Sequence, residues 1–469
     1  MGYQPSMEED SPLKQKVSNV SDLLAFFHES CKNPEDEMIG AEVELHGIHT
    51  DTYKPVTYLE KNGMRSLQNR LIEEMGWKID KQEGKYIISM SRGGAHFSLE
   101  SSEAMGEFAS RVHSSLHNMS SELRLEKNEL LELSRSHNIA WLGIGYQPFS
   151  PVDEIRNVKI KRYLISGEAA VRLKGRSDDY SWSNIASVQT NVDFTSEKDA
   201  GKKFQTLLRL APLMSAMYSH APLRMGKDSK FISYRTHIFR DIYPWRSGIR
   251  ESFFKKGFNF KDWTEFCMEV PMVAIFRGQD WIQVKNRNFS QFLNEGYEGF
   301  TPILEDWVIH LSYIYTDARI KNYIELRVCD SLPPVLVPSV NALTKAFVYH
   351  PDGEEAIKAI TKKWTFEDFN EVYEKIAQEG MEAEVQGKRL IDYCKEVLEI
   401  ASEFLFSFQV LNEQKEDESI YLKPIKHFVF VEGKSPGAWV RDQWNGPWKQ
   451  NPEKLIEWCT SDHLNYGNF

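Results

Sequence analysis

The chain has 469 residues, of which 41% are apolar and 27% are charged, and it carries a net charge of −11. This composition is typical of a globular protein with enough apolar material for a large core. The acidic balance argues against a nucleic-acid-binding protein, because such proteins present a basic surface.

The cysteines and the first residues bear on the location of the protein. Five cysteines are scattered along the chain without a CxxC pair, which favours a reducing compartment and argues against a zinc site or a disulfide framework. No apolar run approaches the roughly 18 residues of a membrane span, and residues 1–16 lack the apolar core of a signal peptide. We therefore expect a cytoplasmic protein with a solvated tail over 1–16 and no membrane partner.

The predicted elements follow one another without an internal repeat or a low-complexity linker. Helices are predicted at 21–31, 56–76, 106–136 and 196–218. Strands are predicted at 38–47, 95–100, 138–148, 184–194 and 321–328, with a hairpin around 82–84. From about 341 onward the pattern is helical, apart from a predicted strand at 426–433.

Four of these strands carry a row of polar side chains on one face. In NIASVQTNVDF (184–194), polar and apolar residues alternate strictly, and a strand directs alternate side chains to opposite faces. The polar rows of the four strands comprise Ser187, Gln189, Asn191 and Asp193; Glu42, Glu44 and His46; His96, Ser98 and Glu100; and Tyr323, Glu325 and Arg327.

The polar rows have two interpretations. They can simply face water on an antiparallel sheet. Solvated strand faces, however, are usually rich in Lys, Thr and Ser, whereas these rows gather Glu and amide side chains. Because acidic faces repel one another unless cations neutralise them, and because hard cations take oxygen ligands, the pattern favours a cradle for such cations.

A cluster of basic residues follows the 196–218 helix. RTHIFRD (235–241) joins one His to two Arg, and Arg246 comes after a turn that contains Pro. These arginines either form surface ion pairs or act as planar forks that recognise carboxylate or phosphate. Other catalytic motifs are absent from the sequence: it has no GxxxxGK[ST] loop, no HExxH and no GxSxG.

Together the elements predict an α+β protein. A catalytic body is expected over 17–340, and a mainly helical portion over 341–469 is expected to pack on it. No linker separates the two, so the second portion is not expected to fold independently.

Six segments, in order, resemble the plant-type glutamate–cysteine ligase family of carboxylate–amine ligases. GAEVE resembles the family's G-x-E-x-E strand, and SVQTNVDFTSEKD matches another segment almost position for position. The six segments are 40–44, 98–110, 143–148, 187–199, 233–241 and 306–327. The resemblance implies a glutamine-synthetase-like fold, with a curved antiparallel sheet that forms an open active-site face between flanking helices.

The resemblance also implies an activity. The family uses ATP and Mg²⁺ to join the γ-carboxylate of L-glutamate, through γ-glutamyl phosphate, to the amine of L-cysteine, which is the first step of glutathione synthesis. Such chemistry depends on positioning and charge neutralisation rather than on a protein nucleophile. The expected partners are these small molecules, and the protein is expected to be a monomer or a homodimer.

The resemblance assigns roles to particular residues. The implied metal ligands are Glu42, Glu44, Glu100, Glu107, Gln189 and Glu325. The implied catalytic residues are Arg235, Arg246 and Arg327. Substrate would be bound by Arg235, His237, Phe239 and Arg246, and the ATP phosphates by Arg327 and Asn191.

Two alternatives stay open. The first is a related ligase that uses a different amine, because Phe239 replaces the family's tryptophan and the following turn reads DIYPWRSG. The second is a catalytically silent relative that acts as a binding or regulatory subunit. The nearly complete acidic set argues against the second, since several Glu in one pocket are costly without cations.

Overall fold

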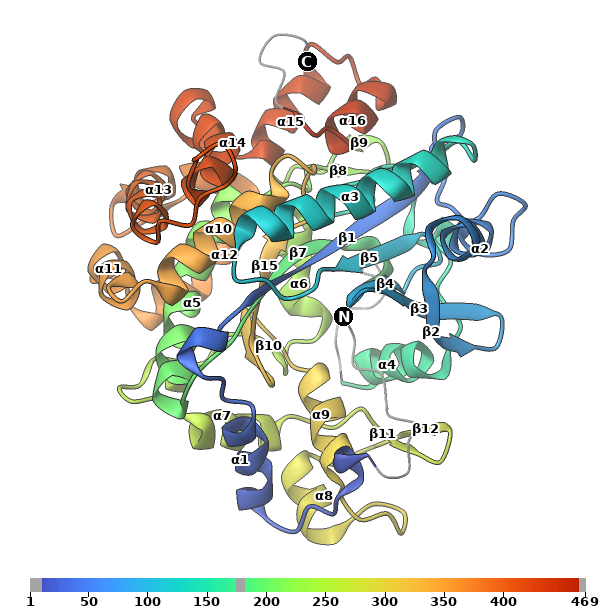
Figure 1. Ribbon diagram of the computed structural model, residues 1–469, viewed down its shortest axis with the longest axis vertical. Coiled ribbons are helices and arrows are strands. Elements are labelled where there is room, and N and C mark those ends of the chain that lie inside the picture. The colour runs from blue at the N-terminus through green and yellow to red at the C-terminus, as the bar shows by residue number, and fades with distance from the viewer. Residues whose placement is uncertain (1–10, 174–181, 464–469) are drawn as a thin grey trace.

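A nine-stranded antiparallel sheet crosses the computed structural model, which describes residues 11–173 and 182–463 (Figure 1). Its strands in chain order are β1 (Ile39–His49), β2 (Lys78–Glu83), β3 (Tyr86–Arg92), β4 (Ala95–Leu99), β5 (Met105–Ala109), β6 (Ile139–Leu142), β7 (Ser187–Val192), β14 (Ala318–Ile320) and β15 (Ile324–Asp330). In space they run in the order β14-β15-β7-β1-β5-β4-β3-β2, and β6 pairs with β1. The long strand β1 therefore lies at the centre of the sheet.

Helices flank this sheet and make up most of the C-terminal portion. Those of the first 340 residues are α1 (Val20–Glu29), α2 (Met64–Met75), α3 (Leu116–Arg135), α4 (Lys161–Arg172), α5 (Glu197–Met217), α6 (Tyr234–Ile242), α7 (Phe260–Glu269), α8 (Phe289–Glu295) and α9 (Leu304–Ser312). The later ones are α10 (Val337–Tyr349), α11 (Gly353–Ile360), α12 (Phe366–Glu379), α13 (Leu390–Ser407), α14 (Lys423–Lys426), α15 (Pro436–Asn445) and α16 (Pro452–Cys459). The α+β prediction with a helical C-terminal portion is confirmed.

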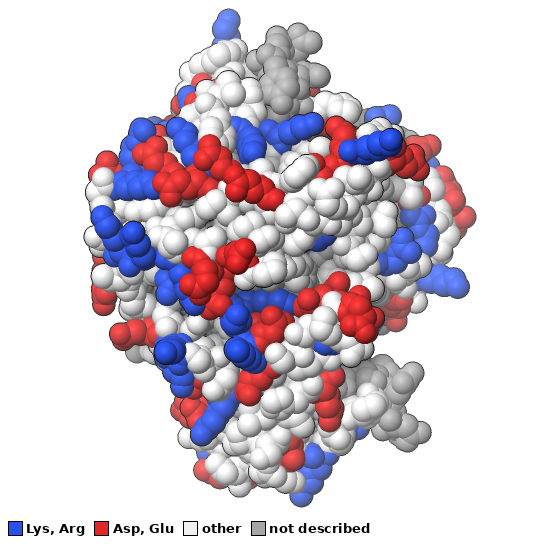
Figure 2. Space-filling model, turned by 60° about the vertical axis from the view of Figure 1, so that its left-hand side comes forward, with Lys and Arg blue, Asp and Glu red and all other residues white. Residues whose placement is uncertain are grey.

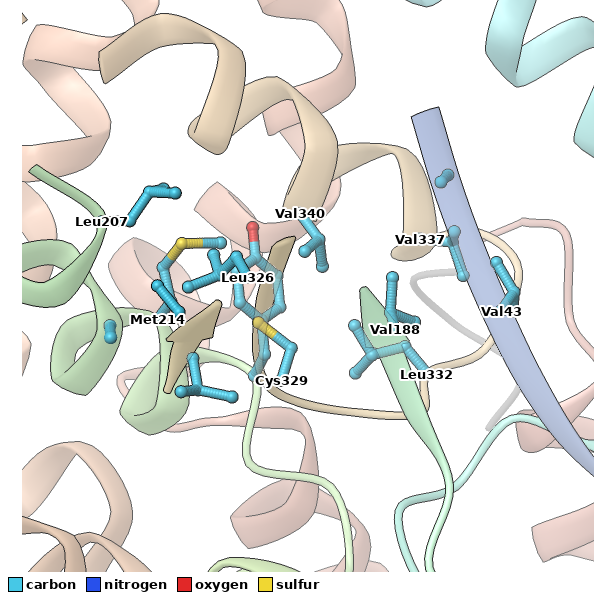
Figure 3. Packing of buried hydrophobic residues seen from close by; sticks show 14 of the residues in the cluster. Val43, Val188, Leu207, Met214, Leu326, Cys329, Leu332, Val337 and Val340 are labelled. Atoms are coloured by element: carbon cyan, nitrogen blue, oxygen red, sulfur yellow. The ribbon is translucent and has the colours of Figure 1, made fainter. Parts of the chain in front are cut away.

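The apolar face of the central strands packs against α5 and α10. Figure 3 shows Val43, Val188 and Leu326 of three neighbouring strands pointing toward the side chains of these helices. Thr190, on the same face of β7, donates a hydrogen bond to Asn341 of α10 (2.8 Å). Because one face of each strand is committed to this core, the alternate residues must lie on the other face.

The strand β15 contains a bulge that changes which residues face the core. Leu326 is opposite Thr190 of β7, but Cys329 is opposite Val188, so β15 has one extra residue between these pairs. Leu326 and Cys329 consequently both face the core. Asp330, opposite Ser187, lies on the polar face of the sheet.

Several predicted elements are confirmed and others are wrong. The helix expected at 196–218 is α5, with the Ser196 side chain accepting a hydrogen bond from the Asp199 amide (3.2 Å) as its N-cap. The predicted helix over 106–136 is wrong at its start, because 105–109 form strand β5 and α3 begins only at Leu116. The helix predicted from 56 begins at Met64, and the strand predicted to 148 ends at Leu142.

The strand predicted at 426–433 is wrong. These residues form the end of α14 and a π-helical turn, His427–Glu432. Phe428 and Val429 are buried, whereas Phe430 and Val431 are 41% and 72% exposed. Two buried residues are therefore followed by two exposed ones, whereas in a strand with one buried face the burial alternates from residue to residue.

The predicted solvated tail over 1–16 falls partly outside the described residues, which begin at 11. Residues 12–14 form a 3₁₀ turn, and the Lys14 ammonium donates a hydrogen bond to the buried Glu305 (2.7 Å). Residues 11–16 thus lie against the protein. None of the described helices is long and apolar enough to cross a membrane.

Charged side chains of both signs are interspersed on the molecular face drawn in Figure 2. The described residues on that face form no continuous basic surface. This distribution differs from the basic footprint of a nucleic-acid-binding protein.

One cluster of buried apolar side chains extends from Val17 to Cys459. Within it, the fully buried Glu418 accepts hydrogen bonds from the Leu116 amide at the start of α3 (2.6 Å) and from the Lys345 ammonium of α10 (2.6 Å). Because the core and the hydrogen bond from the Leu116 amide to Glu418 join both portions of the chain, we propose that 341–469 does not fold independently.

The Glu418 ion pair generates a stability prediction. Glu418→Gln leaves the Lys345 charge buried without its counter-charge, so we expect the free energy of unfolding to fall by about 3 kcal/mol. Urea denaturation measures the change. As a control, Glu382→Gln removes an exposed partner of Arg389 and should change the free energy by no more than about 0.5 kcal/mol. Equal effects of the two substitutions would contradict the role given to Glu418.

Candidate active site

A cavity of about 530 Å³ lies on the polar face of the sheet, between the central strands and helices α4 and α6. The sheet contributes acidic and amide side chains, and α4 and α6 contribute arginines and aromatic rings. Of the residues predicted for the site, those that line this cavity are Glu44, Glu100, Glu107, Gln189, Arg235, Phe239 and Arg327.

The acidic edge of the cavity is formed by the register of β1, β4 and β5. Glu44 is directly opposite Glu107 in the β1–β5 pair, and Glu100 follows directly after β4. The Glu44 carboxylate accepts hydrogen bonds from the Ser187 amide (2.6 Å), the Ser187 hydroxyl (2.9 Å) and the Gln189 side-chain amide (3.2 Å). These bonds fix Glu44 toward β7.

Burial, together with the charges of neighbouring carboxylates, shifts the pKa values of Glu44 and Glu107 upward. Burial, together with the charge of Glu100, raises the pKa of Glu44 to about 7, although Arg235 acts in the opposite direction. Burial also raises the pKa of Glu107 well above its usual range, and Glu42, Glu100 and Glu44 add to this effect. The acidic edge therefore has too much negative charge for its surroundings, and protons or cations must neutralise it.

Glu325 has a different environment from the other acidic residues. Its carboxylate lies 2.5 Å from the Arg319 guanidinium, 2.7 Å from that of Arg327 and 3.4 Å from the Lys321 ammonium. Burial alone would raise the pKa of Glu325, but these three cations outweigh burial and hold it well below the usual value. Its negative charge is thus already compensated.

Two further predicted residues lie behind the cavity surface. Asn191 donates a hydrogen bond to the buried Glu42 (2.8 Å), and neither side chain lines the cavity. Among the described residues, no three acidic, histidine or cysteine side chains already converge as ligands of one metal ion. The carboxylates lie side by side along the edge instead.

Hydrogen bonds to backbone and side-chain oxygens hold two arginines of the cavity in place. Arg235 of α6 donates to the carbonyls of Val328 (3.2 Å) and Arg327 (2.9 Å). Arg327 donates to the Gln189 side-chain oxygen (2.6 Å), which connects the basic and acidic parts of the site. Planar guanidinium groups fixed in this way are suited to binding carboxylate or phosphate.

Two residues predicted for substrate binding do not line the cavity. His237 lies 3.0 Å from Glu374 and stacks on Phe231. It is two residues from Arg235, whereas helical residues share a face at spacings of three or four, as Arg235 and Phe239 do. Arg246 is buried and donates to the carbonyls of Tyr313 (3.1 Å) and Pro271 (2.5 Å), so it supports the cavity wall from behind.

Several residues that line the cavity were not predicted from the sequence. Arg319 of β14 lines the cavity and is fixed by the Ser312 and Ile314 carbonyls (2.9 and 2.8 Å). Arg162 and Tyr163 enter from α4, a helix that was not predicted. The basic residues in DARIKNYIELR were the one available signal for Arg319, since they adjoin the Glu325 strand.

Four aromatic rings form one wall of the cavity. Trp182 lies 5.3 Å from Tyr243, 4.8 Å from Tyr315 and 5.7 Å from Phe239 between ring centroids. We call these residues the aromatic wall. It gives the cavity an apolar side next to its charged sides.

An acidic edge that faces fixed arginines across one cavity suits an enzyme that handles phosphate or carboxylate groups. The family model described as "Glutamate-cysteine ligase family 2(GCS2)" matches residues 38–458. The chain therefore belongs to glutamate–cysteine ligase family 2 and is a ligase, as the resemblance of its six segments implied.

Individual relatives agree with this family. The chain is 26% identical over 453 residues to the chloroplastic glutamate–cysteine ligase of Medicago truncatula, covering 96% of this chain and 86% of the relative. It is 27% identical over 452 residues to that of Arabidopsis thaliana, covering 96% and 84%. The glutamate–cysteine ligase of Francisella tularensis, solved in complex with AMP, shares the fold with a TM-score of 0.55 at 12% identity, covering 90% of this chain and 87% of that chain.

The predicted cytoplasmic location is contradicted by these comparisons, because the plant relatives are named as chloroplastic enzymes. An apolar leader or an apolar span marks secretion or a membrane, not import into a plastid. Transit peptides of plastids are amphipathic and rich in Ser and Arg. The lack of an apolar leader therefore carried no information about a plastid.

The position of His237 generates a prediction. Because its side chain lies outside the cavity, against the exposed Glu374, His237→Ala should leave kcat/KM for the ligase reaction within about twofold of the unsubstituted enzyme. Steady-state kinetics with varied glutamate measure this. A tenfold or larger rise in KM for glutamate would show that His237 contacts substrate after all.

Proposed function

We propose that this protein joins the γ-carboxylate of L-glutamate to the amino group of L-cysteine and converts ATP to ADP and phosphate. The γ-carboxylate attacks the γ-phosphorus of ATP, giving γ-glutamyl phosphate and ADP. The amine then displaces phosphate and loses a proton, giving γ-glutamylcysteine. One observation carries the proposal. In this chain, a member of the family, an acidic edge and fixed arginines face each other across one cavity.

The acidic edge is proposed to hold Mg²⁺. Glu44, Glu100, Glu107 and Gln189 offer oxygen ligands at the cavity surface. Burial and neighbouring carboxylates raise the pKa values of Glu44 and Glu107, and a bound cation would favour their charged forms. Mg²⁺ usually binds few protein carboxylates and takes its remaining ligands from water and phosphate, which fits carboxylates that are not closed around one point. When bound, Mg²⁺ supplies neutralisation of the phosphate oxygens during transfer.

Glu42 and Glu325 are proposed as deeper members of the same ligand set. Both are buried on the polar face of the sheet, and Glu42 is opposite Gln189. To contact a cation, the Glu325 carboxylate must exchange its contact with Arg319 or Lys321. Asn191 would then support the set by holding Glu42 in place.

The arginines are proposed to bind the two anionic substrates. Arg327 and Arg319 flank Glu325 and line the cavity, so we assign them to the transferring phosphate. Arg235 is assigned to a carboxylate of glutamate. Arg246 is assigned to the support of Tyr243, whose ring lies 5.9 Å from its guanidinium carbon.

The acceptor amine is proposed to bind against the aromatic wall. Aromatic rings contact sulfur favourably, at roughly 0.3–1.5 kcal/mol per contact, so the wall suits the thiol of cysteine. Phe239, which replaces the family's tryptophan, belongs to this wall. Because this substitution changes the lining of the proposed acceptor site, a different amine is the second candidate for the acceptor.

Phosphate release tests the proposed function directly. With ATP, Mg²⁺ and glutamate, we expect slow release without any amine, because water intercepts the acyl phosphate, and faster release with cysteine together with a product of the mass of γ-glutamylcysteine. A panel of amines is compared by kcat/KM. An amine that exceeds cysteine tenfold would replace it as the acceptor, and no phosphate release with any amine would refute the ligase activity.

The metal assignment generates a further prediction. Glu44→Gln removes a charged ligand, so we expect kcat to fall at least about 100-fold, the scale of a few kcal/mol for a lost metal-held charge, with saturation shifted to higher Mg²⁺. Glu126→Gln is the matched control. Glu126 of α3 is also buried, and burial raises its pKa to about 8, but it lies outside the cavity. Equal Mg²⁺ dependence in both variants would contradict the assignment.

A further inference from the structure

The carboxylate of Asp330 lies beside the Arg235 guanidinium. Its Oδ1 is 3.5 Å from Arg235 Nη1, and both side chains are buried. The same guanidinium donates to the carbonyls of Val328 and Arg327. The end of β15 thus presents three acceptors to Arg235. Arg235 also lines the cavity, and a guanidinium has five N–H donors, more than these three acceptors use.

The bulge in β15 is what brings Asp330 to this position. Without the extra residue between Leu326 and Cys329, strand alternation would direct Asp330 to the apolar core. With the bulge, Asp330 is opposite Ser187, whose side chain binds Glu44 in the cavity. The bulge therefore brings the Asp330 carboxylate to the face of the sheet that carries Glu44.

Gly145, in the GIGYQP segment, leaves room for the Asp330 carboxylate. A Cβ atom at Gly145 would lie 2.6 Å from Asp330 Cγ and 2.9 Å from Oδ1. The backbone of Gly145 is not in the left-handed region, so only this contact requires glycine. On its other side, Asp330 Oδ2 accepts a hydrogen bond from the His220 amide (2.6 Å).

We propose that Asp330 is a positioning residue that holds the Arg235 guanidinium in the orientation that binds the acidic amino acid substrate, and that Gly145 is needed to admit its carboxylate. The inference rests on the proposed role of Arg235 in binding glutamate. Asp330 gives the buried guanidinium a counter-charge, and without one a buried cation turns toward other acceptors. At 3.5 Å the contact is weaker than a direct hydrogen bond, so it orients Arg235 without occupying all its donors.

Asp330→Asn tests the orientation. Asparagine keeps the size of the side chain and an acceptor for the His220 amide but removes the charge. We expect KM for glutamate to rise at least tenfold, while KM for ATP stays within twofold. Asp306→Asn is the matched control, because Asp306 is equally buried and paired with an arginine, but that arginine, Arg277, does not line the cavity as Arg235 does. An unchanged or lowered KM for glutamate in Asp330→Asn would overturn the proposal.

Gly145→Ala displaces the same carboxylate without changing any charge. It therefore tests the positioning role of Asp330 even if Asp330→Asn does not fold. We expect the same selective rise in KM for glutamate. Gly40→Ala is its control, since a Cβ there meets only ordinary contacts at 3.7 and 3.8 Å. When combined with Asp330→Asn, Gly145→Ala should add less than twofold, because both changes act on one interaction. A normal KM for glutamate in folded Gly145→Ala would overturn the proposal. So would a double variant in which the effects of the two substitutions on this KM multiply fully.

Arg235→Lys separates failure of this inference from failure of the proposed function. A lysine ammonium cannot replace a planar fork on a carboxylate, so we expect a higher KM for glutamate in this variant. If Arg235→Lys behaves normally, the assignment of Arg235 to glutamate is wrong. If Arg235→Lys is impaired while Asp330→Asn and Gly145→Ala are not, only the positioning role of Asp330 is wrong.

Discussion

The burial of several carboxylates side by side on one face of an antiparallel sheet is the constraint on which the site depends. Register places Glu44 opposite Glu107, and burial, together with the charges of neighbouring carboxylates, raises the pKa of both. Such crowding is unfavourable unless opposite charge is supplied. The protein supplies part of it through Arg319, Arg327 and Lys321 around Glu325, and we propose that Mg²⁺ supplies the rest.

The other face of the sheet and the C-terminal helices keep these groups in place. The apolar residues of β1, β7 and β15 are packed against α5 and α10 (Figure 3), so the alternate residues have no freedom to turn away from the cavity. The buried Glu418, which accepts a hydrogen bond from the Leu116 amide at the start of α3, connects the last third of the chain to the rest of the fold. The cavity is therefore a property of the whole fold, which agrees with a family match that extends to residue 458.

Strict alternation made part of this site predictable from the sequence. It correctly indicated β1, β7 and most of β15, and with them the acidic face, because a strand with a buried side obeys a period of two. Alternation could not reveal the bulge before Cys329, which moves Asp330 to the polar face. It also gave no sign of Arg162, which reaches the cavity from α4 through tertiary packing. His237 does not line the cavity, because residues two apart on a helix point to different sides.

The most direct test of the account is the fate of the γ-carboxylate oxygen of glutamate. If the cavity activates this group by phosphoryl transfer, one carboxylate oxygen must leave with the phosphate when the amine attacks. Glutamate labelled with ¹⁸O in its γ-carboxylate is incubated with ATP, Mg²⁺ and cysteine, and the released phosphate is analysed by mass spectrometry. The account predicts one ¹⁸O atom in each phosphate, and unlabelled phosphate accompanying the amide product would contradict it.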